Sequence, residues 1–431
     1  MIAVAFVIFL VVALILAGFP VFIALGLSGL IGFLITGGLS SLAALPSAMY
    51  GQIDSFVLVA VPLYIFMGEI LAASGLGKDL FATLSNWFNR IPGGLAVAST
   101  WACALFGAVC GVSIAGVAAI GPFAVPEMVK KGYDGRLASG SLAASGALAT
   151  LIPPSIVMIV YGSIAHVSVA KLFIGGIVPG IVLAALMSIY VILRVLFNPK
   201  LAPMDKARIS WGVRFRSLLD IAPVLALAVT IVVTLYSGAA TATELGAFGV
   251  VGAMVIARFF YKNFNFPLLR RVLFSSTRAT SAVLLIVASS LCFGNFLNYM
   301  KVPEIFAKWS LTLPFSPSTV VVLFMVLLVF LGMLVDGISV IVITTPILLP
   351  AVISMGLDPL WYGILVALNI EIAVISPPVG MNLYMMKGVV PELSLDDIIA
   401  GAAPFMIVEF ICILLFLYFP QFALWLPNLM G

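Results

Sequence analysis

The chain has 431 residues, of which 64% are hydrophobic and only 8% are charged. Because soluble globular proteins carry about 25% charged residues, this composition excludes a soluble protein and indicates one that crosses a membrane many times. The net charge of +4 is small and predicts no nucleic-acid partner. Segments of alternating polarity are absent, so an α-helical bundle is favoured over a β-barrel.

Hydropathy predicts eight uninterrupted membrane spans, near residues 2–17, 21–36, 55–74, 173–196, 218–236, 241–261, 275–298 and 399–421. Residues 136–165 and 360–386 form two further spans, each interrupted near its centre. Amphipathic segments near 78–90 and 299–310 are expected to lie at the membrane surface. Residues 2–36 are expected to be retained, as two spans or as one long kinked helix, because they lack the basic start of a signal peptide.

The charges of the connecting segments predict the orientation, since cytoplasmic loops retain Lys and Arg. Basic segments, expected in the cytoplasm, are 77–90, 130–136, 198–216 and 262–271, whereas 37–54, 237–243 and 356–360 contain no Lys or Arg. This orientation requires the apolar stretches 93–130 and 318–355 to enter and leave on the same side, as re-entrant hairpins. Ten crossings then place both termini outside.

An internal repeat appears when the chain is shifted by 224 residues. Every proline between residues 122 and 154 then meets a proline: Pro122 meets Pro346, Pro126 meets Pro350, Pro153 meets Pro377, and Pro154 meets Pro378. Five crossings lie between the two copies, an odd number, so the copies are inverted. Inverted repeats with broken helices are typical of secondary transporters, whose binding sites lie near the bilayer midplane.

The broken helices predict a buried ion site, because helix breaks free backbone carbonyls that must be satisfied inside the protein. Near the first break and tip the oxygen-bearing side chains are Ser113, Ser145, Thr150 and Ser155; near the second they are Asp336, Ser339, Thr344, Thr345, Ser376 and Asn382. Such hard oxygen ligands suit a monovalent cation. The alternative is that these hydroxyls bond back to their own helices and that the small residues serve close packing.

Asp336 is an acid inside an apolar hairpin, a position that costs about 3 kcal/mol on insertion scales and is functional by default. The alternative is a protonated Asp that caps the hairpin turn. Glu69, Glu244, Glu371 and Glu409 also lie in apolar surroundings, and Glu371, close to the second break, is a candidate for proton or ion coupling. Sequence motifs of hydrolases, metalloproteases and nucleotide-binding loops are absent, so the chain is not expected to be an enzyme, and an ion gradient is expected to drive transport.

The segments "FGAVCGVSIAGVAAIG" and "LVDGISVIVITTP", each followed by a double-proline break, resemble the large membrane subunit of tripartite ATP-independent periplasmic (TRAP) transporters. The resemblance covers essentially the whole chain. It implies an elevator-type fold in the bacterial inner membrane and Na⁺-driven uptake of an organic acid, such as a C4-dicarboxylate or sialic acid. It also implies two partners, a small four-helix membrane subunit and a periplasmic substrate-binding protein.

The resemblance also implies site residues. The first tip, Cys110–Gly116, and the break at Thr150–Ser155 would form sodium site 1, from Cys110, Gly111, Ser113, Ser145, Thr150 and Pro153. The second tip, Asp336–Ser339, and the break at Ser376–Met381 would form site 2, from Asp336, Gly337, Ser339, Thr344, Thr345, Ser376, Gly380 and Met381. Substrate would meet Ser113, Ser155, Ser339 and Asn382. The first tip reads Cys110-Gly111-Val112-Ser113 where the family commonly has Ser-Gly-Ser-Ser, which removes two hydroxyls from site 1.

The predicted organisation has five parts: scaffold spans and an arm (1–92), a first transport repeat (93–165), further scaffold spans with a second arm (166–317), a second transport repeat (318–386) and a last span (387–431). Two other functions remain open from the sequence. One is a single-component Na⁺/carboxylate symporter, which would need no binding protein. The other is a non-transporting scaffold or channel subunit, which would show no response to Na⁺.

Overall fold

The computed structural model describes residues 2–44, 46, 49–50, 54–204 and 209–430, and in this part the chain is helical without strands. Seven described helices are long and apolar enough to cross a membrane, or eight if one bent pair counts as a single span. The all-helical, multi-pass membrane fold predicted from the sequence is therefore confirmed.

The N-terminal residues form two helices, α1 (Ile2–Leu16) and α2 (Val21–Gly37), followed by a 3-10 turn η1 (Leu39–Ala44). The chain reverses between them at Ala17–Pro20, and α1 packs against α2. A single kinked helix would hold its two halves apart, so the two-helix alternative is the correct one. In turn α2 packs closely on α13, since a Cβ on Gly29 would come within 2.6 Å of the Cys292 backbone.

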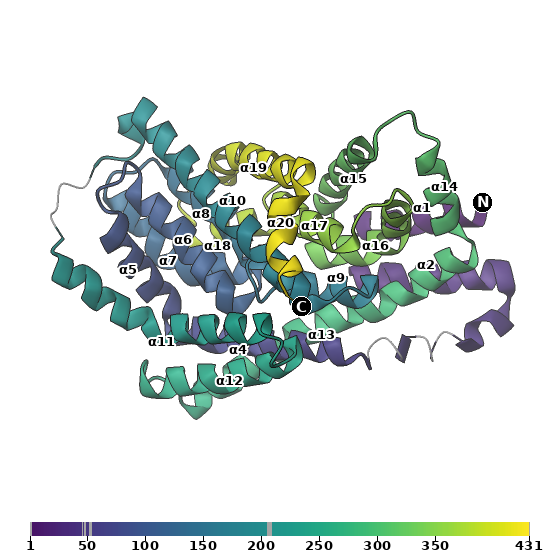
Figure 1. Cartoon of the computed structure of the whole chain (residues 1–431), viewed down its shortest axis with the longest axis horizontal. Helices are drawn as coiled ribbons and strands as arrows, with labels where there is room; N and C mark the ends of the chain where they lie inside the picture. The colour runs from purple at the N-terminus through teal and green to yellow at the C-terminus, as the bar shows by residue number, and fades with distance from the viewer. Residues whose placement is uncertain (1, 45, 47–48, 51–53, 205–208, 431) are drawn as a thin grey trace.

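Among the helices outside the two repeats, α4, α11 and α12 lie together along one side of the molecule (Figure 1), whereas the helix over residues 169–197 packs mainly against the first repeat and the C-terminal helices. Their bounds are η2 (Phe56–Val59), α4 (Ala60–Ser74), α10 (Val169–Phe197), η3 (Pro199–Leu201), α11 (Trp211–Tyr236), α12 (Ala242–Phe259) and α13 (Phe266–Tyr299). The start of α13 lies well before the predicted residue 275. Asn265 caps it by accepting from the Leu268 N–H at 2.9 Å, and the polar first turns extend the helix beyond its apolar part.

The two repeats have matching helices. The first consists of α6 (Gly94–Cys110), α7 (Ser113–Lys130), α8 (Gly135–Leu151) and α9 (Ile156–Ala165). The second consists of α15 (Pro317–Gly332), α16 (Gly337–Ser354), α17 (Pro359–Val374) and α18 (Met381–Val389). The first residues of α7 and α16 are 224 positions apart, and both helices contain two prolines at matching places. Asp134 and Asp358 likewise cap α8 and α17. The internal repeat inferred from the prolines is therefore also present in the arrangement of the helices.

The two repeats interlock rather than lie side by side, because α16 packs against α9 and α7 packs against α18. The predicted surface segments are the helices α5 (Leu76–Phe88) and α14 (Val302–Leu311). The helix α5 contacts the hairpin helices α6 and α7 as well as α11, and α14 contacts α16 as well as α13. Each arm thus bridges one hairpin and the long helices outside the repeats.

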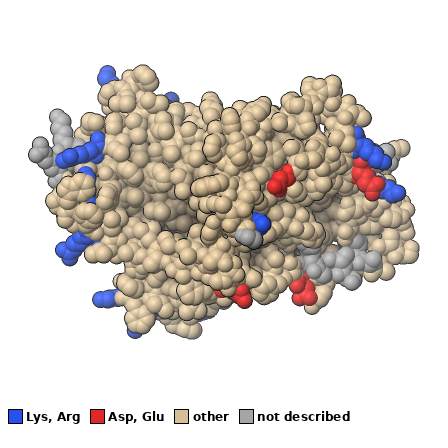
Figure 2. Space-filling view, in the orientation of Figure 1, with Lys and Arg blue, Asp and Glu red and all other residues tan. Residues whose placement is uncertain are grey.

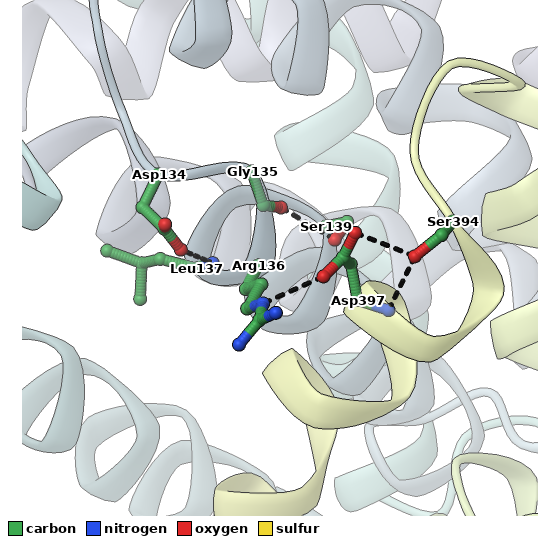
Figure 3. Close-up of polar contacts among 7 residues, drawn as sticks. All are labelled: Asp134, Gly135, Arg136, Leu137, Ser139, Ser394 and Asp397. Carbon is green, nitrogen blue, oxygen red and sulfur yellow. Dashed lines mark hydrogen bonds and ion pairs between the residues drawn. The ribbon is translucent and has the colours of Figure 1, made fainter.

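The predicted last span is two helices, α19 (Leu395–Tyr418) and α20 (Pro420–Asn428), because Pro420 disfavours helical geometry in the preceding residue and ends α19. The start of α19 is tied to the start of α8, where Arg136 Nε donates to Asp397 Oδ1 at 2.8 Å (Figure 3). One turn further on, a Cβ on Gly140 would lie 2.1 Å from the Gly401 carbonyl carbon, so the two backbones touch. The helix α19 is therefore held to the first repeat.

Charged side chains lie mainly toward the ends of the face in Figure 2, and most of the area between is uncharged. Lys and Arg concentrate at the left end, where α5 lies (Figures 1 and 2). A face with so few charged side chains is expected of a protein embedded in lipid.

Candidate ion and substrate site

The first hairpin turns at Gly111, whose φ of +69° is readily adopted by glycine. A Cβ at this position would lie 2.3 Å from the Pro154 carbonyl oxygen, so the tip touches the break of its own repeat. The Ile156 N–H donates to the Gly111 carbonyl at 3.5 Å across this contact. The break itself bends α8 and α9 by 42°.

The second tip and break repeat this contact. The Val379 N–H, in the break between α17 and α18, donates to the Met333 carbonyl at 3.2 Å at the second tip. Gly380 has a φ of +33° and begins the turn into α18. The Pro153–Pro154 and Pro377–Pro378 peptide bonds are both cis. Each hairpin tip is therefore held against the break of its own repeat by backbone.

The double prolines provide oxygen ligands, because proline has no N–H to donate to the carbonyl four residues earlier. Pro153 and Pro154 remove the helical donors of the Ala149 and Thr150 carbonyls. Pro377 and Pro378 do the same for the Ala373 and Val374 carbonyls. Two of these four regain a donor: the Thr150 carbonyl accepts from the Ser155 hydroxyl and the Ala373 carbonyl from the Ser376 N–H. Carbonyl oxygens at both breaks fit a hard monovalent cation such as Na⁺.

A cavity of about 140 Å³ lies where both tips and both breaks meet, and it faces α4 and α13. Its lining includes Ser113, Ile156, Gly337 and Met381, which are the first residues of α7, α9, α16 and α18. Four helix N-termini, two from each repeat, therefore converge on one cavity. Helix N-termini carry partial positive charge, so this arrangement favours an anionic group through the helix dipoles, while the Ile156 and Ser339 N–H groups are already bonded to the Gly111 carbonyl and the Asp336 carboxylate.

The cavity has few polar side chains, and none of the described residues lining it is basic. A wider recess of about 610 Å³ adjoins the cavity and shares Ile114 and Met381 with it. The recess extends along α18 to Gly388, beside Lys387. The recess gives a small ligand a route toward the end of α18.

Six of the predicted site residues line the cavity: Gly111, Ser113, Thr150, Asp336, Gly337 and Met381. Asp336 is also the N-cap of α16, as the alternative interpretation expected. Its Oδ1 accepts from the Ser339 N–H at 3.0 Å and its Oδ2 accepts from the Ser339 hydroxyl. Val112, its counterpart under the shift of 224 residues, has no capping side chain, so the two tips differ chemically.

The other predicted residues are not part of the lining of this cavity: Cys110, Ser145, Pro153, Ser155, Ser339, Thr344, Thr345, Ser376, Gly380 and Asn382. Ser145 donates to the Ser141 carbonyl at 2.6 Å and meets the Thr100 hydroxyl at 2.8 Å, within the packing of α6 and α8. Thr344 and Ser376 donate to carbonyls of their own helices. These three hydroxyls therefore bond back to their own helices, which was the alternative to a role as ion ligands.

Asn382 lies behind the first tip, where its side chain joins the two repeats. Its Nδ2 donates to the Ser113 hydroxyl at 2.8 Å and to the Ala143 carbonyl at 3.0 Å. Both side chains are buried. The predicted substrate contacts at Ser113 and Asn382 are thus engaged with each other, and Ser113 alone of the two reaches the cavity lining.

Two acids are fully buried, and one of them has a contact that the sequence did not predict. Glu371, expected near the second break, accepts from the Thr150 hydroxyl at the first break. Glu409 of α19 is also fully buried. The apolar surroundings of both acids were visible in the sequence, but the contact of Glu371 with Thr150 depends on how α17 packs on α8.

The first tip also touches α4, outside the repeats. A Cβ on Gly68 would come within 2.7 Å of the Cys110 Sγ and 2.8 Å of its Cα. Only a residue without a side chain fits here. This is the closest described approach between α4 and the first tip among the glycine contacts.

Comparisons with known proteins agree with this architecture. The family model described as "Tripartite ATP-independent periplasmic transporter, DctM component" matches residues 7–422. The chain is 33% identical to the C4-dicarboxylate TRAP transporter large permease protein DctM of Pseudomonas aeruginosa, over 95% of this chain and 94% of that protein. It is 30% identical to the ectoine TRAP transporter large permease protein TeaC of Halomonas elongata, over 97% of each. The crystal structure of the Alcanivorax borkumensis YdaH transporter shares the fold, with a TM-score of 0.65 at 16% identity, covering 90% of this chain and 89% of that one.

Proposed function

The chain belongs to the DctM component family of tripartite ATP-independent periplasmic transporters, and we propose that it carries a small organic acid across the inner membrane in symport with Na⁺. It is thus the large permease of a multi-pass inner-membrane transporter. The coupling ion, the class of substrate and the movement of the repeats are parts of this proposal.

The convergence of four helix N-termini on one cavity carries this proposal. An organic acid presents a carboxylate, and the starts of α7, α9, α16 and α18 offer it favourable dipoles without a basic side chain. The relatives carry different solutes by name, a C4-dicarboxylate and ectoine, and ectoine also bears a carboxylate. A site formed by helix N-termini suits this range of solutes because it binds the carboxylate that they share. Other contacts would then determine which solute is selected.

Sodium is the proposed coupling ion because the freed carbonyls at both breaks are neutral oxygen ligands beside the anion cavity. A cation bound at each break would offset the charge of the substrate. Asp336 lines the cavity and adds the one carboxylate. We assign it to the second sodium site, as well as to the cap of α16.

The proposed movement is a displacement of the interlocked repeats against α4, α11, α12 and α13. The cavity supports this proposal because its outer wall comes from Ile65 of α4 and from Ala279 and Val283 of α13, whereas both tips come from the repeats. A small membrane subunit and a periplasmic binding protein are the proposed partners, in keeping with the three-part transporter of the family description.

The test is uptake of a radiolabelled C4-dicarboxylate into proteoliposomes that hold this chain and its small subunit, with an imposed Na⁺ gradient, with and without the binding protein. The key variant is Asp336→Asn. Its matched control is Asp134→Asn, which changes another half-buried N-cap acid with the same 3.0 Å bond to an N–H, far from the cavity. Uptake should require Na⁺ and the binding protein, fall in Asp336→Asn and persist in Asp134→Asn.

Other outcomes separate the alternatives. Uptake without the binding protein would identify a single-component symporter. Uptake that ignores Na⁺ would contradict the ion sites at both breaks. If a panel of carboxylates, including ectoine and sialic acid, is not transported at all, the chain is a scaffold rather than a carrier.

A further inference from the structure

The recess beside the cavity runs along one face of α18. Four of its lining residues recur at intervals of three and four positions, which places them on the same side of this helix: Met381, Tyr384, Met385 and Gly388. Met381 also lines the cavity where the tips and breaks meet. Tyr384 therefore stands about one helical turn from the cavity, on the face of α18 that leads away from it.

The cavity alone is small for a site that binds an organic acid. Its volume is about 140 Å³, below the roughly 300–1,000 Å³ of typical ligand sites, whereas the adjoining recess has a volume of about 610 Å³. A substrate whose carboxylate lies at the four helix starts would therefore extend into the recess. Its far end would meet the side chains of α18.

Tyr384 is the one residue with a polar side-chain group among the described residues that line the recess. The others are Ile114, Pro378, Val379, Met381, Met385 and Gly388. The Tyr384 side chain is 53% exposed, so a ligand in the recess can reach it. Lys387 is not part of this lining, and its Nζ donates to the Pro391 and Leu393 carbonyls at 2.8 and 2.7 Å.

The Tyr384 hydroxyl has a hydrogen-bond partner that a ligand can replace. It donates to the Pro378 carbonyl at 3.2 Å, which is longer than the usual O–H···O distance of about 2.5–3.0 Å. Pro378 also lines the recess, so both residues of this bond border the space that a ligand would occupy. Exchanging a long bond at an exposed position for one to a charged ligand group is favourable, because hydrogen bonds to charged groups are the stronger ones.

The polar side chains of the cavity itself are already bonded within the protein. Ser113, Thr150 and Asp336 each have a hydrogen bond to another side chain. An acceptor group at the far end of the substrate would therefore find its side-chain donor at Tyr384.

We propose that the Tyr384 hydroxyl binds the far end of the substrate and selects acids that carry a second hydrogen-bond acceptor, such as a second carboxylate. One carboxylate lies at the helix starts in the cavity, and the second group accepts from Tyr384 in the recess. An acid without a second polar group leaves Tyr384 bonded to Pro378 and gains no hydrogen bond there. This inference rests on the organic-acid transport proposed above and adds the residue that distinguishes one acid from another.

The experiment is equilibrium binding of ¹⁴C-labelled succinate to the purified chain with its small subunit, in lipid nanodiscs with Na⁺. The binding protein is left out, because its own selectivity would mask that of the permease. Unlabelled succinate and butyrate compete in turn, and butyrate has the same four carbons but only one carboxylate. Glutarate and valerate form a second pair, one carbon longer.

The variant is Tyr384→Phe, which removes only the hydroxyl. Its matched control is Tyr299→Phe at the end of α13, where the side chain is similarly exposed and lines neither the cavity nor the recess. Wild type and control should bind each dicarboxylate more tightly than its monocarboxylate. Tyr384→Phe should bind the dicarboxylates at least about tenfold more weakly, the usual loss for a hydrogen bond to a charged group, and should bind the monocarboxylates as wild type does.

Failure of this inference and failure of the proposed function give different results. If Tyr384→Phe weakens both kinds of acid equally, the residue only supports the site structurally, and its role in selection is wrong. Unchanged dicarboxylate affinity in the variant, or equal affinity of wild type for both kinds of acid, would also overturn that role while binding of an organic acid stands. If wild type binds none of these acids, the proposed function fails, and the assignment of Tyr384 fails with it.

Discussion

Ser113 and Asn382 are 269 residues apart in the chain, yet their side chains pair in the protein interior. The Ser113 hydroxyl lies 2.8 Å from the Asn382 Nδ2 and 3.0 Å from its Oδ1. Ser113 begins α7 at the first tip, and Asn382 lies at the start of α18 after the second break. This side-chain pair thus connects the two repeats.

Replacement of Asn382 with alanine should destabilise the protein by about 1–3 kcal/mol, because the buried Ser113 hydroxyl and Ala143 carbonyl both lose a partner. Thermal melting in detergent measures this. Since Ser113→Ala removes part of the same pair, the double variant should melt close to Asn382→Ala alone. The exposed Asn298→Ala serves as control. Additive losses in the double variant would show that the pair does not act as a unit.

The two roles of Asp336 can be separated by substitution. Asparagine is also a good N-cap, so Asp336→Asn should melt near wild type without sodium but lose the rise in melting temperature that sodium gives. Asp336→Ala should lose the sodium response and about 1 kcal/mol of stability, the usual value of a cap. Asp134→Ala should lose only the cap. A full sodium response in Asp336→Asn would remove this carboxylate from the second site.

The contact between Gly68 and Cys110 predicts a steric effect on transport. A methyl group at position 68 would meet the Cys110 backbone at 2.8 Å, and such overpacking costs about 1–3 kcal/mol. Because about 1.4 kcal/mol is a factor of ten, initial uptake by Gly68→Ala should fall about tenfold if this conformation lies on the transport path. Gly294→Ala is the control, since its methyl group would sit 3.8 Å from its nearest neighbour. Equal uptake by both variants would mean that α4 moves away from the first tip at little cost, and that this contact does not limit transport.

Asp79, on the arm α5, predicts a pH dependence of stability. Burial, followed by the neighbouring Asp220 carboxylate, raises the pKa of Asp79. The folded protein therefore holds this proton more tightly than the unfolded chain, and the resulting stability is present in acid and lost as pH rises through the raised pKa. Asp79→Asn should then raise the melting temperature at neutral pH and change it little in acid. The exposed Glu392→Gln should show no such difference, and a gain that is independent of pH would contradict the argument.

The features that followed from the sequence are those set by local chemistry. Pro153, Pro154 and their counterparts interrupt a helix wherever they stand, so both breaks were predictable. Charge in the loops and the shared register of the prolines then identified the hairpins and the repeat. The turn at Gly111 and the cap at Asp336 also depend on residues close in sequence.

The features that did not follow are set by packing between distant segments. The hydrophobic context of Glu371 was evident, but its contact with Thr150 depends on where α17 crosses α8. Ser145 looked like an ion ligand because it lies near the break, whereas the packing of α6 turns it toward Thr100. The convergence of four helix starts likewise became visible only in three dimensions.

The interlocking of α9 with α16, and of α7 with α18, has a consequence for biosynthesis. Membrane helices insert first and pack afterwards, and chains emerge from the N-terminus. When α7 and α9 leave the ribosome, the helices that will cover them have not yet been made. The first repeat must therefore wait in the bilayer with its broken helix incomplete, and its freed backbone needs water, lipid headgroups or an insertion factor until residue 389 has been synthesised. A chain that ends between the repeats would lack α16 and α18, which pack against α9 and α7 in the complete fold.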